Sequence, residues 1–231
     1  MKRKERSFAR FVFYFCSFRF CDYTYMNNLI CKTSKISFFL LYLASLPIII
    51  NIDLILSIWL GDNVPMYTNQ FCILFLVASL FNAISSPLWI SVYATGRIKN
   101  YQIAVSTIFL SDIIIVYVIF RNFNTSPVIA MIVKTMVNMI RVFVRMFFAA
   151  KEVPGFSISR YIKNTLVPVS IVILLTGTMC SPLLCVKLDS IARIIMTIPM
   201  FAVSCFVSFK IGLSIQERQY IISFINKTIK R

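Results

Sequence analysis

The chain has 231 residues, of which 59% are hydrophobic and only 14% are charged, and its mean hydropathy is +0.83. A soluble domain carries roughly 25% charged residues and cannot hide so much apolar surface, so the composition argues strongly against a soluble globular protein and indicates an integral membrane protein. The net charge of +16 comes from 24 basic and 8 acidic residues, but the basic residues stand mostly between long apolar runs, which disfavours nucleic-acid binding and is typical of membrane-protein loops.

The first 21 residues are aromatic and basic and are not expected to form a span. The run 11–21 is interrupted by Arg19, so it is too short and too charged to cross a bilayer. It also lacks the small-residue cleavage site of a secretory signal. We expect an interfacial or disordered leader, and the alternative is a segment out of place through truncation or a shifted reading frame.

Six apolar stretches follow, and each is close to the roughly 20 residues that a helix needs to cross a bilayer. They cover about 36–60 (with a hydrocarbon part at 36–52), 71–94, 101–120, 127–150, 164–186 and 191–213. Helices are expected, because open sheets leave backbone groups unsatisfied in lipid and the alternation of a barrel strand is missing. The sequence therefore predicts an all-α membrane lobe of six transmembrane helices over residues 22–213.

The tail, residues 214–231, is basic. Its apolar residues fall partly on one helical face, so it is predicted to be either an amphipathic helix on the cytoplasmic membrane surface or a solvated segment. Lys and Arg are concentrated before the first stretch, in the loops 95–100 and 151–163 and in the tail, whereas the loop 61–70 has none. The positive-inside rule therefore predicts that both termini are cytoplasmic, and an even number of spans fits this orientation.

The fourth stretch carries charges that are costly inside a bilayer, at roughly 2.5–3.5 kcal/mol each on insertion scales. Four of its polar residues recur at steps of four, three and four residues and so share one helical face: Lys134, Asn138, Arg141 and Arg145. This polar stripe predicts a water-filled cavity or an anionic partner, with the four residues binding substrate. The alternative is that the charges snorkel or form structural pairs, and this is hardest to argue for Arg141.

Asp112 lies near the middle of the third stretch and is the natural partner for one of these cations. We expect either an ion pair with the stripe or a carboxylate that couples transport to protons or sodium ions. Asp53, at the outer end of the first stretch, is expected at the interface.

Features of an enzyme are missing from the sequence. The chain has no histidine, its seven cysteines are scattered without a Cys-x-x-Cys pair, and neither a nucleotide-binding loop nor a Gly-x-Ser-x-Gly motif occurs. We therefore expect no enzymatic activity, no metal site and no cofactor.

Two blocks of residues, around the first stretch and at the end of the second, carry a family resemblance. The first block comprises Ser34-Lys35-Ile36-Ser37-Phe38, Leu46-Pro47 and Ile55-Leu56-Ser57-Ile58-Trp59-Leu60-Gly61 with Val64-Pro65 and Tyr67. The second comprises Ser86-Pro87 and Tyr93-Ala94-Thr95-Gly96-Arg97-Ile98-Lys99-Asn100-Tyr101-Gln102, and Arg145 and Tyr161 also stand where the family has an Arg and a Tyr. From about Asp22 onward the chain resembles the polysaccharide-biosynthesis flippases, which share a superfamily with multidrug extruders and lipid II flippases.

The resemblance implies the C-terminal lobe of a transporter whose two six-helix lobes move against each other around a central site. It implies a place in the bacterial inner membrane and a substrate made of an oligosaccharide repeat unit on a polyprenyl pyrophosphate, exported for surface polysaccharide synthesis. The cationic stripe would attract the pyrophosphate. The implied partners are the bilayer and either an N-terminal lobe or a second copy.

Three other functions stay open. A drug or cation extruder of the same superfamily is disfavoured, because a cationic substrate needs acidic lining residues and only Asp112 lies deep in a span. The chain could also be an inactive remnant or an assembly partner of a flippase. A glycan-processing membrane enzyme would need acidic residues or histidines gathered at one membrane face, and the sequence shows no such cluster.

Overall fold

The computed structural model describes residues 23–61, 64–122, 126–185, 190–213 and 218–219. Within these ranges the protein is all-α, as predicted, with no strand. Its elements in chain order are α2 (Tyr23–Ile50), α3 (Ile52–Leu60), α4 (Thr68–Ala94), α5 (Lys99–Asn122), α6 (Val128–Glu152), α7 (Ile158–Tyr161), the π-helix η2 (Ile162–Leu166), α8 (Val167–Cys185), α9 (Ser190–Val207) and the π-helix η3 (Ser208–Gly212). The leader and all of the tail except residues 218–219 lie outside the described residues.

Five helical segments are long and apolar enough to cross a membrane, which makes this a multi-pass membrane protein. They are Thr24–Ile50, Thr68–Ala94, Lys99–Asn122, Ile158–Met179 and Ile195–Gly212. The remaining predicted span corresponds to α6, which has 25 residues but carries too many charges to belong to this group on hydropathy. Whether α6 can also cross the membrane depends on whether its charged side chains face other helices or lipid.

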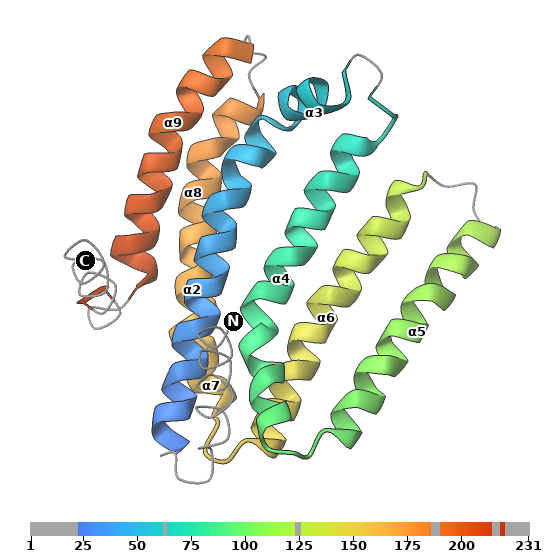
Figure 1. Cartoon of the computed structure of the whole chain (residues 1–231), viewed down its shortest axis with the longest axis vertical. Coiled ribbons are helices and arrows are strands. Elements are labelled where there is room, and N and C mark those ends of the chain that lie inside the picture. The colour runs from blue at the N-terminus through green and yellow to red at the C-terminus, as the bar shows by residue number, and fades with distance from the viewer. Residues whose placement is uncertain (1–22, 62–63, 123–125, 186–189, 214–217, 220–231) are drawn as a thin grey trace, which may run out of the picture.

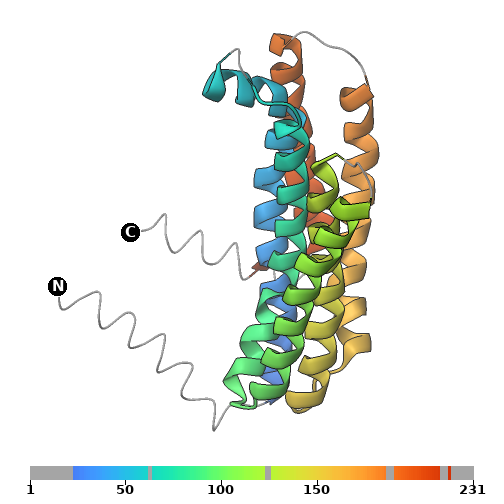
Figure 2. The ribbon, with the colours of Figure 1, turned by 90° about the vertical axis from the view of Figure 1, so that its right-hand side faces the viewer.

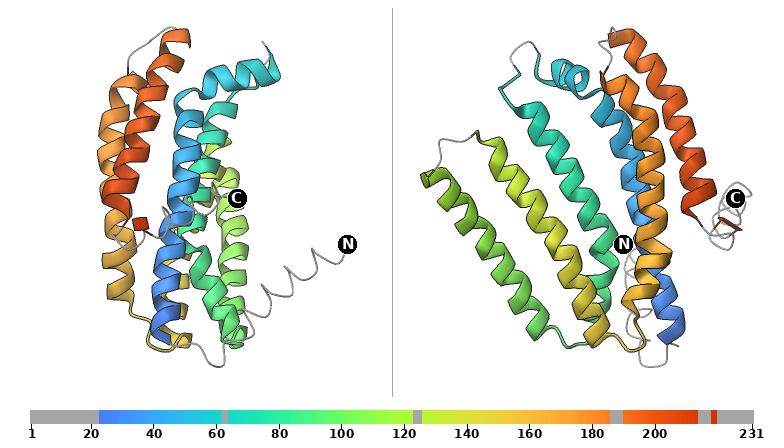
Figure 3. Two further views of the ribbon diagram at one scale, coloured as in Figure 1. Left: turned by 60° about the vertical axis from the view of Figure 1, so that its left-hand side comes forward. Right: turned by 180° about the vertical axis from the view of Figure 1, so that it is seen from behind.

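The long helices fan out side by side in the order α9, α8, α2, α4, α6 and α5 (Figure 1), and the view from behind shows the same fan (Figure 3). α4 is central and packs against α2 on one side and α6 on the other, while α8 and α9 pack against α2. α5 stands at one edge and packs mainly against α6. Its outward face consequently exposes large apolar side chains such as Leu110, Ile113 and Tyr117, as expected for a surface that meets lipid.

The first predicted stretch, 36–60, is divided between two helices instead of forming one continuous helix. α2 begins at Tyr23 and ends at Ile50, and α3 turns away to lie across the end of the fan (Figure 2). At the break, the Asn51 side-chain nitrogen donates to the Pro47 carbonyl at 3.1 Å and to the Thr197 hydroxyl of α9 at 3.0 Å. These bonds compete with a continuous helix and anchor the turn to a distant element.

α3 exposes its apolar residues, since Ile58 and Trp59 are 76% and 82% exposed. Asp53 is also exposed on this helix, and its carboxylate accepts a hydrogen bond from the Asn69 side chain. A short helix across the bundle end with exposed Trp and Ile has the character of an interfacial segment.

The other boundaries differ by smaller amounts. The second, third and fourth predicted stretches agree with α4, α5 and α6 to within a few residues, the usual uncertainty of helix ends. The fifth begins earlier than predicted, at Ile158, and passes through η2 before α8; Pro168 follows this π-turn and cannot donate a backbone hydrogen bond. The sixth is α9 continued by η3.

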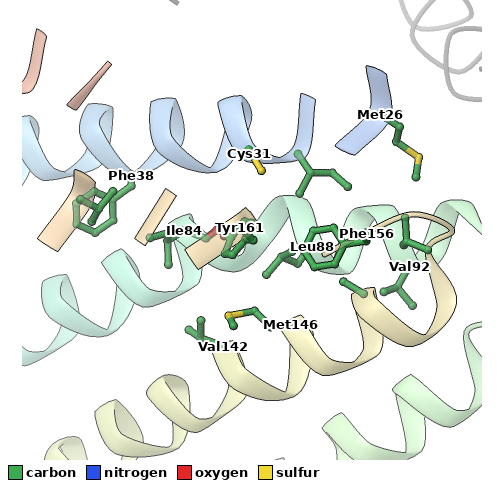
Figure 4. Packing of buried hydrophobic residues seen from close by; sticks show 14 of the residues in the cluster. Met26, Cys31, Phe38, Ile84, Leu88, Val92, Val142, Met146, Phe156 and Tyr161 are labelled. Atoms are coloured by element: carbon green, nitrogen blue, oxygen red, sulfur yellow. Dashed lines mark hydrogen bonds between the residues drawn. The ribbon is translucent and has the colours of Figure 1, made fainter. Parts of the chain in front are cut away.

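The buried core lies where α2, α4 and α6 meet α7 and the chain just before it (Figure 4). Leu88 and Val92 of α4 and Tyr161 of α7 are completely buried. The Tyr161 hydroxyl donates a 2.8 Å hydrogen bond to the Ile84 carbonyl on α4. This bond links two segments 77 positions apart and satisfies a phenol that would otherwise be buried without a partner.

Basic side chains gather at one end of the fan. The start of α2, the turn between α4 and α5, the turn between α6 and α7, and α7 itself all lie at this end (Figure 1). The basic residues of these segments, and of η2 directly after α7, are Lys32, Lys35, Arg97, Lys99, Lys151, Arg160 and Lys163. The opposite end carries α3 and the end of α5, and Arg121 belongs to the last turn of α5.

Candidate functional site

The predicted polar stripe lies on α6, and helix packing divides it. Asn138, Arg141 and Arg145 are only 5%, 6% and 8% exposed, because this face of α6 is covered by α4 and α5. Lys134 is exposed, and its ammonium nitrogen lies 6.0 Å from the centroid of the Phe75 ring on α4. The structure therefore brings three of the four predicted residues together and leaves Lys134 outside the buried group.

Arg145 is held by α4. Its Nη1 donates to the Ser85 hydroxyl oxygen at 2.6 Å and to the Asn82 amide oxygen at 3.3 Å. The Ser85 hydroxyl in turn donates to the Phe81 carbonyl one turn back at 2.8 Å, so its oxygen acts as donor and acceptor at once. The Nε of Arg145 has no hydrogen-bond partner. This guanidinium is thus largely, but not fully, satisfied by neighbouring side chains.

Arg141 is held less well. Its guanidinium carbon lies 4.0 Å from the centroid of the Phe109 ring on α5, a cation–π contact, and its Nε is buried without a hydrogen-bond partner. Asp112, one turn after Phe109, attracts Arg141 electrostatically, while Arg145 repels it. One oxygen of the Asp112 carboxylate is itself buried without a hydrogen bond. Two guanidiniums and one carboxylate leave this group of residues with net positive charge.

Sequence reasoning missed the groups that surround the two arginines. Tyr101 on α5 is 3% exposed and interacts electrostatically with both Arg145 and Arg141. Asn82 and Ser85, three positions apart in an uncharged stretch, could have been recognised as a polar pair on one face of α4. Phe109 carries no comparable signal, since one aromatic residue in an apolar helix is unremarkable.

We use the name α6 polar cluster for five buried residues, two half-buried residues and the Phe109 ring beside them. The buried residues are Ser85, Tyr101, Asn138, Arg141 and Arg145, and the half-buried residues are Asn82 and Asp112. Guanidinium groups bind phosphate with charge-assisted, often bidentate hydrogen bonds, so the chemistry available to this cluster is the binding of an anion. An open cavity of about 370 Å³ that described residues line lies elsewhere, and no residue of the stripe lines it. The water-filled passage expected beside Arg141 stays a prediction.

Metal binding was not expected. Among residues 23–61, 64–122, 126–185, 190–213 and 218–219, no group of three or more His, Cys, Asp or Glu side chains lies close enough together to hold a metal ion.

Each of the two sequence blocks contains a turn that favours glycine. Gly61 ends α3 with a φ of 72°, and Gly96 lies between α4 and α5 with a φ of 78°. Side chains with a Cβ rarely adopt this left-handed region, which explains glycine at both positions without reference to function.

Comparison of this chain with family models, with curated proteins and with solved structures finds no match. The resemblance to polysaccharide-biosynthesis flippases therefore rests on the quoted residues alone.

Proposed function

We propose that this chain takes part in moving an oligosaccharide on a polyprenyl pyrophosphate across the bacterial inner membrane, as one six-helix lobe that works with a second lobe or a second copy. The observation that carries the proposal is Arg141, a buried guanidinium in mid-helix that faces a phenyl ring and lacks a hydrogen bond at Nε. The sequence blocks around Gly61 and Gly96 supply the substrate class, because they are the part of the chain that resembles the flippases.

The charge balance of the α6 polar cluster supports an anionic substrate. Burying an arginine in a membrane costs roughly 2.5–3.5 kcal/mol on insertion scales, so an apolar residue would serve better if position 141 only filled space. The electrostatic repulsion between Arg141 and Arg145 adds to this cost, and Asp112 offsets only part of it. A pyrophosphate beside these groups would compensate the excess charge.

α6 would be a membrane span in addition to the five segments identified by hydropathy. α6 stands between α4 and α5 in the fan and matches them in length (Figure 1). Its polar face turns toward these two helices, while Met136, Ile140 and Phe143 are exposed on its other side. A helix packed in this way can cross a bilayer because its two arginines face other helices and lipid meets a mainly apolar side, with the exposed Lys134 in its second turn close enough to the end of the helix to snorkel.

Asp112 would balance part of the positive charge of Arg141 when no substrate is bound. In the absence of substrate, its carboxylate attracts Arg141 electrostatically without a direct ion pair, and an arriving pyrophosphate would take its place as the main negative charge beside Arg141. The released carboxylate would then be able to take up a proton or a sodium ion, which is how Asp112 would couple transport to an ion.

A structural or assembly role is the second candidate, and one observation favours it. The hydrogen bonds from Arg145 to Asn82 and Ser85 tie α6 to α4 within this chain, as expected if the arginine stabilises helix packing. On this view the chain would bind no pyrophosphate.

Binding of polyprenyl pyrophosphate distinguishes the two candidates. The purified chain in nanodiscs is titrated with this lipid, alongside Arg141→Gln and the matched control Lys134→Gln, which removes the same charge from an exposed position on the same helix. We expect Arg141→Gln to bind about tenfold more weakly, as for the loss of one charge-assisted contact, and Lys134→Gln to bind like the wild type.

Equal binding by wild type and Arg141→Gln, with both proteins melting at the same temperature, would contradict the proposal. Export is tested separately, by expressing the chain and each variant in a flippase-deficient strain and measuring surface glycan. Restored glycan with wild type and Lys134→Gln but not with Arg141→Gln is the expected result. Restoration by all three would remove Arg141 from the mechanism.

A further inference from the structure

A second cationic site lies away from the α6 polar cluster, where α2, η2 and η3 meet. The cavity of about 370 Å³ is lined there by Lys32 and Lys35 of α2 and by Lys163 of η2. Asn28 and Asn164 also line it, and none of its lining residues is acidic. Three lysines from two segments of the chain, more than 100 positions apart, thus line one space.

The three lysines differ in burial. Lys35 is only 5% exposed, Lys32 is half-buried and Lys163 is exposed. Lys32 and Lys35 are three positions apart, so they share one face of α2 and repel each other. Like charges around a common space favour an anion there, and the adjacent amides can add hydrogen bonds to its oxygens.

The depth of the cavity in the membrane follows from the sequence around the lysines. After Lys35 the next charged residue is Asp53, and after Lys163 the next is Lys187. Both lysines therefore stand where a long uncharged segment begins. In a membrane-spanning helix this is the level of the lipid headgroups, where phosphate groups lie.

We propose that this cavity, hereafter the lysine pocket, binds a phosphate-bearing anion at the level of the headgroups on the basic side of the membrane. The volume lies in the range of small-ligand pockets and can hold a phosphate with a small polar substituent. The phosphate can belong to an anionic phospholipid or to a soluble ion. The lysine pocket does not depend on transport, because it shares no residue with the α6 polar cluster.

The test uses the purified full chain in nanodiscs of phosphatidylcholine. In one arm phosphatidylglycerol is added to the nanodiscs, and in the other inorganic phosphate is added to the buffer. Native mass spectrometry counts the phosphatidylglycerol molecules retained after transfer to detergent, and isothermal titration measures inorganic phosphate. The variants are Lys163→Gln, an exposed position expected to leave folding intact, and the double variant Lys35→Gln/Lys163→Gln.

Lys151→Gln is the matched control, since it removes one exposed charge at the same end of the molecule but does not line the lysine pocket. We expect wild type and Lys151→Gln to bind alike, Lys163→Gln to bind about tenfold more weakly, and the double variant to bind least. Lys163→Arg, which keeps the positive charge, should bind like the wild type.

Retention of phosphatidylglycerol with this pattern identifies a lipid headgroup as the ligand, and the same pattern with inorganic phosphate identifies a soluble one. Binding in neither arm, or equal loss in Lys151→Gln and Lys163→Gln, overturns the proposal. A lysine pocket that fails this test leaves polyprenyl pyrophosphate binding at Arg141 untouched, so the two proposals fail separately.

Discussion

Arg141 and Arg145 lie one helical turn apart on α6, but their side chains make different contacts. Arg145 makes two hydrogen bonds to α4, so its charge is partly compensated by two polar side chains of that helix. Arg141 meets a ring, and its carboxylate neighbour Asp112 retains an unbonded oxygen. The first residue therefore ties α6 to α4, while the second lies against a ring with an unbonded Nε, which is why the proposed anion site is placed at Arg141.

Removing the Ser85 hydroxyl should destabilise the protein. Ser85→Ala takes away the shorter of the two hydrogen bonds to Arg145 and leaves a buried guanidinium less satisfied, which should lower the free energy of unfolding by about 1 kcal/mol. Ser79→Ala, on the same helix, is the control because the Ser79 hydroxyl donates only to the carbonyl of Phe75 in its own helix. Thermal melting in detergent compares them, and an equal effect of both variants would refute this role for Arg145.

At the scale of elements, the last turn of the α9 segment closes tightly on α2. η3 ends at Gly212, and a Cβ placed on this residue would collide with the Phe39 ring of α2. Gly212 also lines the lysine pocket, so this close approach brings η3 up to the lysines of α2. The contact requires glycine for space and not for backbone conformation, because Gly212 has no positive φ.

Gly212→Ala should therefore destabilise the protein by overpacking. The expected loss is about 1–3 kcal/mol of unfolding free energy, because the aromatic ring must move away from its buried position. Gly177→Ala in α8 is the matched control, since a Cβ there meets no atom within 4 Å. That variant should be neutral or more stable by up to about 1 kcal/mol through helix propensity. Melting temperatures that fall equally in the two variants would contradict the close packing of η3.

The whole molecule is asymmetric in charge along the direction of its helices. Lys and Arg residues gather at the end that holds the start of α2 and the turns after α4 and α6, whereas the opposite end presents α3 with its exposed Trp59 (Figures 1 and 2). The positive-inside rule predicts that the basic end is cytoplasmic. Two connections far apart in the sequence, 95–98 and 153–157, should then share one side of the membrane.

Labelling of single cysteines tests this topology. In a background whose seven native cysteines are replaced by serine, Arg97→Cys, Ser157→Cys and Met66→Cys are treated with a membrane-impermeant maleimide. We expect Met66→Cys to react in intact spheroplasts, and the other two to react only after the membrane is opened, because they lie at the basic end. Reaction of all three from one side would exclude the proposed orientation.

Hydropathy, length and helical periodicity were enough to predict an all-α membrane protein and to place Asn138, Arg141 and Arg145 on one face of a helix. These are local properties, since a bilayer requires each segment to satisfy its own backbone and period 3.6 determines which residues share a face. The same reasoning could not separate Lys134 from the other three, because exposure depends on where α4 and α5 cover α6. Sequence reasoning also treated α2 and α3 as one stretch. The bond from Asn51 to Thr197 that anchors the break connects segments 146 positions apart, so no local pattern predicts it.

The tertiary structure alone decided which distant residues meet. Ser85 reaches Arg145 across 60 positions, and Lys163 joins Lys35 around one cavity, although no spacing in the sequence relates the members of either pair. Charges within a membrane are tolerated or used according to the partner that another helix provides. The sequence thus indicated that this chain enters the bilayer, while the packing of its helices determined which of its basic side chains are buried against another helix and which line a common pocket.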